Sequence, residues 1–146
     1  MCRYQLADGQ KVDVLPQDPE ILGFSNRWYP EAFQSAATYH LPSGRAIRAI
    51  TPLYFLATKL EAFEHRGKGD FRSKDIEDIT LVLYENPGVI EQLRDGAGAI
   101  HQSVRQQLGT YARQPAFEDA VFGCFPGDGA SQAAAADLLA RIAGRR

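Results

Sequence analysis

A chain of 146 residues that is 45% hydrophobic and 23% charged has the size and composition of one ordinary globular domain, which argues against a mainly disordered protein. The formal net charge of −2 argues against a protein built chiefly to coat nucleic acid or an anionic membrane. Two cysteines are too few for a disulfide framework, and neither a secretory signal nor a membrane-length apolar run is visible, so we expect a soluble, cytoplasmic protein.

Residues 2–15 have the pattern of an antiparallel hairpin. Apolar and polar side chains alternate over residues 2–6 and 11–15, and Asp8-Gly9 between them marks a tight turn. Asp13 stands out in the second strand, because aspartate is uncommon in strands and a rigid strand fixes the direction of a carboxylate that binds a metal. The alternative is an ordinary charge on an exposed strand edge.

Residues 18–50 are expected to hold two short helical pieces and two strands. Asp18-Pro19 predicts the start of a helix that ends at Gly23, and residues 26–32 form the second helical piece. Residues 33–41 are compatible with a helix or a strand but favour a strand, and residues 45–50 alternate as a strand does.

A helical period begins at Thr51-Pro52, and its apolar residues recur until Phe63, after which Gly67 and Gly69 end the helix. Lys59 and Arg66 lie on one stripe of this segment, two turns apart. Two cations on one face are suited to holding a triphosphate. The alternative interpretation of Lys59 is a solvated lysine beside an apolar stripe.

The next helix starts after Ser73 and has its apolar stripe between Ile76 and Leu83. Asp75 and Asp78 are three residues apart and therefore share one face of this helix, where they are candidates for a site with Lys59. Two simpler explanations stay open. The helix dipole alone accounts for an acid at position 75, and an i, i+4 pair with Lys74 accounts for the acid at position 78.

The rest of the chain is expected to be helical, with one helix from Asn86-Pro87 and others over residues 97–113, 115–122 and 131–143. Because strands come first and helices follow, the order of elements favours an α+β fold. No zinc-ligand spacing, nucleophile elbow or Walker-type phosphate loop is present in the sequence.

The helical motifs together resemble those of the AbiEii-type nucleotidyltransferases, the toxin half of type IV toxin–antitoxin systems. In that family a Lys-x-x-Ala helix with a following Arg is succeeded by a basic residue, Asp, two residues and Asp. The matching residues are Lys59-Leu60-Glu61-Ala62, Arg66 and Lys74-Asp75-Ile76-Glu77-Asp78. The strand Val12-Asp13-Val14 looks like the one that carries the family's third metal-binding carboxylate, so the resemblance covers about residues 3 to 85.

This resemblance implies a partial nucleotidyltransferase fold over residues 1–86, with a small mixed or antiparallel sheet, on which a helical region of residues 87–146 packs. It also implies transfer of a nucleotide from a nucleoside triphosphate with Mg²⁺, which carboxylates hold in place. Asp13 would then be a metal ligand, and Lys59 and Arg66 would contact the nucleotide. Asp75 and Asp78 would position the base, the metal or Lys59.

One motif of the family has no counterpart here. Its Gly-Ser turn and Asp-x-Asp strand, which supply most of the metal site, would precede Asp13, where only 12 residues stand. We therefore expect no nucleotidyl transfer by this chain, and the acceptor, RNA included, stays open. The alternatives are a non-catalytic module that binds a nucleotide or docks a partner such as an antitoxin protein, and a structural domain without a ligand.

Overall fold

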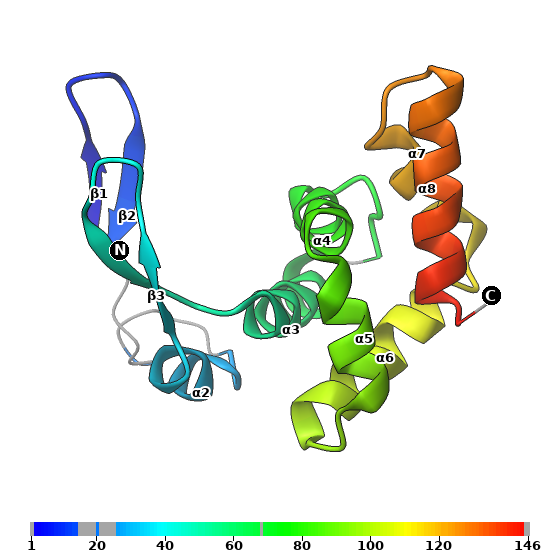
Figure 1. The fold of residues 1–146 in the computed structure, drawn as a ribbon, viewed down its shortest axis with the longest axis horizontal. Coiled ribbons are helices and arrows are strands. Elements are labelled where there is room, and N and C mark those ends of the chain that lie inside the picture. Colours follow the sequence, from blue (N-terminus) through cyan, green and yellow to red (C-terminus); the bar gives the residue numbers. More distant parts are fainter. Residues whose placement is uncertain (1, 15–19, 21–25, 68, 145–146) are drawn as a thin grey trace.

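The computed structural model describes residues 2–14, 20, 26–67 and 69–144. Over these residues the strands lie in the N-terminal part and the later part is helical, which confirms the expected α+β class. Figure 1 shows the strands with α2 at one end of the molecule and α7 with α8 at the other. The helix expected from Asp18-Pro19 to Gly23 lies outside the described residues. Within the described ranges, no helix has the length and apolar character needed to pass through a membrane.

Two hairpins make up the strand-forming part. Their strands are β1 (Cys2–Gln5), β2 (Lys11–Val14), β3 (Ala37–His40) and β4 (Ala46–Ala49). β1 pairs antiparallel with β2, and β3 pairs antiparallel with β4. In the described part of the chain these are two separate two-stranded sheets, so the strands do not join into the one small sheet that the resemblance implied.

The two hairpin turns are built in the same way. Gly9 and Gly44 have φ values of 85° and 80°, and the N–H of each donates to a carbonyl three residues earlier, at Leu6 and Leu41 respectively. A residue with a side chain is strained at such a φ, which explains a glycine at the end of both turns.

α2 (Tyr29–Gln34) occupies residues 33 and 34, for which the sequence favoured a strand. Pro30 lies in the first turn of this helix, where a missing N–H has little cost, so the proline suits the start of the helix. The strand prediction was therefore wrong for these two residues, and β3 begins at Ala37.

The later helices follow the predicted pattern within a few residues. α3 (Pro52–Ala62) continues into a π-helical turn, η1 (Phe63–Gly67), and α4 spans Lys74–Glu85. The last four helices, α5 to α8, are Pro87–Asp95, Ala99–Tyr111, Pro115–Gly123 and Gly129–Ile142.

One hydrophobic core joins these helices. Its fully buried side chains include Leu56 and Leu60 of α3, Ile79 of α4, Val104 of α6 and Phe117 of α7. α5 and α6 lie against α3, and α7 lies against α4, so the helices after residue 86 pack on those before it. A division into two regions at residue 86 stays a prediction, because the core crosses that position.

Candidate functional site

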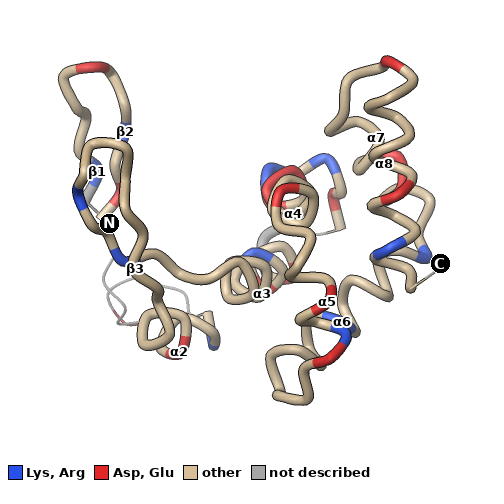
Figure 2. Tube along the Cα trace, in the orientation of Figure 1, with Lys and Arg blue, Asp and Glu red and all other residues tan. Residues whose placement is uncertain are grey.

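Lys59 meets Asp75 and Asp78 where α3 and α4 pack together. Its ammonium nitrogen lies 2.7 Å from Asp78 Oδ2 and 3.2 Å from Asp75 Oδ1. Asp75 and Asp78 follow Lys59 by 16 and 19 positions in the sequence, and their side chains converge on its ammonium group. Figure 2 shows a basic segment of α3 beside the charged first turns of α4. We refer to these three residues as the Lys59 cluster.

The sequence places the Lys59 cluster at the border of the helix-packing face. Each of its members directly precedes a buried residue of the core, namely Leu60, Ile76 and Ile79. Successive residues of a helix are rotated by about 100°, so each charged side chain projects from the edge of the apolar stripe. Two such edges meet when α3 packs on α4, and the opposite charges lie face to face.

The charges of the cluster are partly withdrawn from water. The side chains of Lys59, Asp75 and Asp78 keep only 23%, 8% and 22% of their surface exposed. Charges at such depth depend on one another, because removal of one partner leaves the others without compensation. The interpretation of Lys59 as a freely solvated lysine therefore does not hold.

Asp78 also binds a second lysine. Lys74 Nζ lies 3.2 Å from Asp78 Oδ1 and 3.1 Å from Glu77 Oε2, so the i, i+4 pair with Lys74 exists beside the pair with Lys59. Partial burial raises the pKa of the Asp78 carboxyl, but hydrogen bonds from Lys59 and Lys74 outweigh burial and hold that pKa below its ordinary value. At neutral pH Asp78 is therefore a carboxylate that joins two ammonium groups.

The Lys59 ammonium group keeps donor capacity for a ligand. It has three N–H donors, and two of them are directed at the carboxylates of Asp75 and Asp78. The ring of Phe55 lies 5.6 Å from the same nitrogen, within cation–π range. The cluster can thus present one oriented N–H donor at the surface, beside the two carboxylates that balance the charge of Lys59.

Two residues that precede α2, and that the sequence did not single out individually, hold this part of α3. Asn26 is buried, and its Nδ2 donates to the carbonyl oxygen of Thr58 at 2.9 Å, one residue before Lys59. Arg27 forms an ion pair with Glu61, with Nε and Oε2 3.1 Å apart. The Asn26 contact spans 32 residues of sequence, and no local pattern indicates a partner so far along the chain.

Asp13 lies apart from the Lys59 cluster. Its two carboxylate oxygens accept hydrogen bonds from Arg3 at 2.6 Å and 2.8 Å, across the β1–β2 ladder in which the two residues are directly paired. Figure 1 shows this hairpin well separated from α3 and α4. The structure therefore does not bring Asp13 together with Lys59, Asp75 and Asp78, and the interpretation of Asp13 as an exposed edge charge fits its contacts.

The donor set does not fit the implied Mg²⁺ ion at Asp13. Both oxygens of that carboxylate are occupied by the guanidinium of Arg3, and Asp78 is occupied by two lysines. Nowhere in residues 2–14, 20, 26–67 and 69–144 do three or more His, Cys, Asp or Glu side chains gather as a metal would need. The contact of Arg66 with a nucleotide stays a prediction, since its side chain is outside what the structure describes.

Comparisons with known proteins give no family for this chain. No protein-family model, no curated protein and no solved structure matches it. The resemblance to AbiEii-type nucleotidyltransferases therefore rests on the motifs around Lys59, Asp75 and Asp78 alone, and it enters the function of the chain as a proposal.

Proposed function

We propose that this protein is nucleotidyltransferase-like, is related to the AbiEii-type toxins, and binds a nucleoside triphosphate through Lys59 without transferring the nucleotide. The Lys59 cluster carries the proposal, because the lysine and the two aspartates of the family-like motifs meet at 3.2 Å and 2.7 Å. We place the protein in the cytoplasm, where triphosphates are available.

Of the three roles that the resemblance implies for Asp75 and Asp78, the contacts favour the positioning of Lys59. Both carboxylates bind the ammonium group of Lys59, and Asp75 is the more deeply buried of the two. A lysine that is already ordered loses less conformational freedom when it binds a phosphate, which favours affinity. Asp75 and Asp78 are therefore positioning residues in this proposal.

Nucleotide transfer in the intact family requires Mg²⁺, which supplies charge neutralisation at the leaving pyrophosphate when it is bound. The acids that would take part here are engaged by Arg3, Lys59 and Lys74. For this reason the proposal stops at binding. An acceptor such as RNA has no part in it.

The test is the thermal stability of the full chain with each of the four nucleoside triphosphates at millimolar concentration, with and without Mg²⁺. A ligand that binds only the folded state stabilises it by about 2.7 kcal/mol at a hundred times its dissociation constant. We expect a rise in melting temperature for wild type and for Lys11→Met, whose lysine lies exposed on β2, and none for Lys59→Met.

The shift that the ligand causes is compared within each variant, so a lower starting stability of Lys59→Met does not confuse the result. Equal shifts in Lys59→Met and wild type, or no shift with any triphosphate, would contradict nucleotide binding at Lys59. Incorporation of labelled nucleotide into RNA or protein by the wild-type chain would contradict the absence of transfer.

A second candidate function, the binding of a partner protein such as an antitoxin, is favoured by the hairpins. The β1–β2 hairpin exposes four large apolar side chains, of Tyr4, Leu6, Val12 and Val14, by 42% to 58% of their surface. Exposed apolar surface on a small sheet is typical of a face that another chain covers. The absence of any nucleotide-induced shift in the experiment above would leave this candidate as the preferred one.

A further inference from the structure

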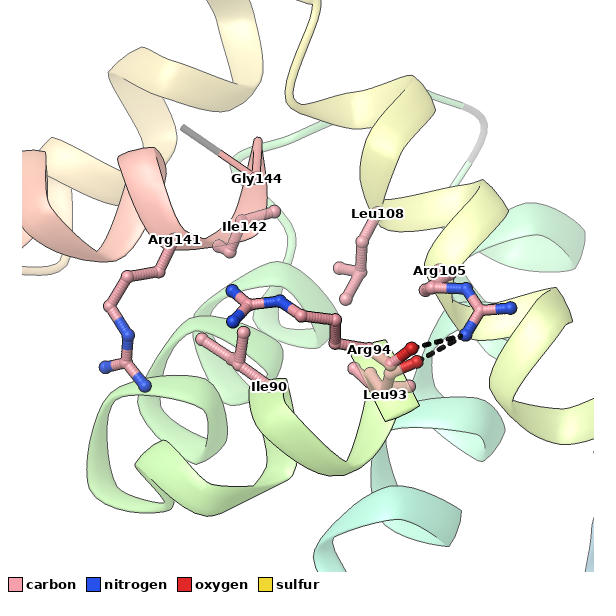
Figure 3. A pocket seen from close by; sticks show the side chains of 8 residues that line it. All are labelled: Ile90, Leu93, Arg94, Arg105, Leu108, Arg141, Ile142 and Gly144. Carbon is pink, nitrogen blue, oxygen red and sulfur yellow. Dashed lines mark hydrogen bonds between the residues drawn. The ribbon is translucent and has the colours of Figure 1, made fainter. Parts of the chain in front are cut away.

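A cavity of about 160 Å³ lies between α5, α6 and the C-terminal end of α8 (Figure 3), and no residue of the Lys59 cluster lines it. Four aliphatic side chains give it an apolar lining: Ile90, Leu93, Leu108 and Ile142. Gly144 and three arginines also line it, namely Arg94 from α5, Arg105 from α6 and Arg141 from α8, and none of the described residues that line it is acidic. The cavity therefore combines an apolar interior with three cationic side chains.

Two of the arginines are fixed by backbone carbonyl groups. Arg105 Nη1 donates to the carbonyl oxygens of Leu93 at 2.6 Å and Gly96 at 2.9 Å, at the C-terminal end of α5. Arg141 Nη2 donates to the carbonyl oxygen of Pro87 at 2.9 Å. Carbonyl groups orient a guanidinium group, but they carry no full negative charge and leave each arginine cationic.

Arg94 is the arginine whose donors are free to meet a ligand. Its side chain makes no ion pair or hydrogen bond with any residue in the described ranges. Figure 3 shows its guanidinium group extending over the cavity, between Ile90 and Ile142. A planar group with five N–H donors in this position matches a carboxylate or a phosphate, which it can bind through two parallel hydrogen bonds.

Acids stand near these arginines in the sequence, with Glu91 and Asp95 close to Arg94 on α5, but neither forms an ion pair with Arg94 in the described residues. Asp137 and Glu85 line a separate hollow on the other side of Arg141, and neither forms an ion pair with it within 4.0 Å. Arg141 also lines the hollow that holds Asp137 and Glu85, whereas Arg94 and Arg105 do not line it. The anionic end of a ligand is therefore expected at Arg94 and Arg105.

We propose that this cavity binds a small organic anion with an apolar body, in which the apolar part enters between Ile90, Leu108 and Ile142 and the carboxylate or phosphate faces Arg94. The size of the cavity suits an aromatic ring or a short acyl chain. This site goes beyond the proposed nucleotide binding, since it uses other helices and other cations than the Lys59 cluster does. It stands whether or not Lys59 binds a triphosphate.

The test is a titration of the full-length, isotope-labelled chain by NMR with benzoate, phenyl phosphate and the neutral analogue benzamide. Small ligands of this kind reach dissociation constants of roughly 1 mM. We expect both anions to shift the amide signals of Leu93 and Gly144, which line the cavity, and benzamide to bind more weakly by roughly tenfold.

Arg94→Gln is the decisive variant, because Arg94 is exposed and its replacement leaves the core unchanged. It should weaken both anions by roughly tenfold, since a charge-assisted hydrogen bond is lost. Arg113→Gln, at an exposed arginine outside this cavity, is the matched control and should bind as wild type does. Equal binding of benzamide, unchanged binding in Arg94→Gln, or shifts confined to other parts of the chain would each overturn the proposal.

Discussion

Asp78 joins α3 to α4 electrostatically, since its two oxygens accept from Lys59 at 2.7 Å and from Lys74 at 3.2 Å. Of these two lysines, only Lys59 lies on the opposite helix, and Asp75 binds the same ammonium group. The carboxylate is mostly enclosed, so water replaces these hydrogen bonds poorly when one partner is removed. Much of what holds the ammonium group of Lys59 in place therefore depends on Asp78.

Asp78→Asn should lower the free energy of unfolding at pH 7 by about 1–3 kcal/mol, because a charged hydrogen bond to each lysine is weakened. The pKa of Asp78 is lowered in the folded state, so its stabilising contribution is present above the ordinary aspartate value near 3.9 and is lost as the pH falls further. We expect the difference between wild type and variant, measured by urea unfolding, to be large at pH 7 and 5 and to shrink towards pH 3.

Asp119→Asn is the control for this experiment, because Asp119 is exposed on α7 and pairs with no residue that the structure describes. It should change the free energy of unfolding little at any of these pH values. A difference between Asp78→Asn and wild type that is as large at pH 3 as at pH 7 would show that lost packing, and not lost charge, causes the destabilisation.

At the scale of elements, helical period was the most informative property of the sequence. The buried residues Leu53, Leu56, Leu60 and Phe63 recur at helical spacing, which predicts α3 and its continuation into η1. The same periodicity predicts that Asp75 and Asp78 share a face, but it does not predict which helix that face meets. Their contact with Lys59 depends on the packing of α3 on α4, which is a property of the whole core.

Helix boundaries were predicted less well, and α8 gives the physical reason. The sequence predicted its start at Ser131, whereas the helix begins at Gly129. Asp128 caps it, since Oδ1 accepts from the backbone N–H groups of Ala130 and Ser131 at 3.1 Å and 3.0 Å. Ser131 takes part in the cap as well, as its hydroxyl donates to Asp128 Oδ2 at 2.6 Å. Asp128 and Ser131 are both residue types that cap helices, so the sequence alone does not show which of them is the cap. The hydrogen bonds show that it is Asp128.

Asp128→Ala should open the first turn of α8, because the two N–H groups lose their acceptor. We expect amide hydrogen exchange at Ala130 and Ser131 to become about fivefold faster and the melting temperature to fall, with little change in the middle of the helix. Asp128→Asn keeps an acceptor and should retain most of the protection, while Asp137→Ala, at an exposed position within α8, should leave the first turn as it is. Unchanged exchange in Asp128→Ala would mean that the cap does not determine where the helix begins.

For the whole molecule, the strands and the helices differ in how they are stabilised. Every buried core residue that the structure describes lies at or after Trp28, and the side chains of β2 are exposed throughout. A lone two-stranded sheet is at best marginally stable in water. The sequence predicted the β1–β2 hairpin correctly, but alternation says only which side chains share a face and not what covers that face. This is why the pairing of Asp13 with Arg3, and not with the helical site, could not be foreseen.

Deletion of residues 1–14 should therefore leave the helical core cooperatively folded, with a melting temperature within about 4 °C of that of the full chain, which corresponds to roughly 1 kcal/mol. Deletion of residues 129–146 is the matched control, because it removes the buried side chains Ala135 and Leu138 and should lower the melting temperature by about 10 °C or more. The near-ultraviolet circular dichroism signal of Trp28, which is buried in the core, follows the unfolding transition in both variants. A destabilisation by the loss of residues 1–14 as large as that by the loss of α8 would mean that the hairpin packs on the helices in solution. Asp13 would then lie close to the helices, and its role as a metal ligand would need to be tested again.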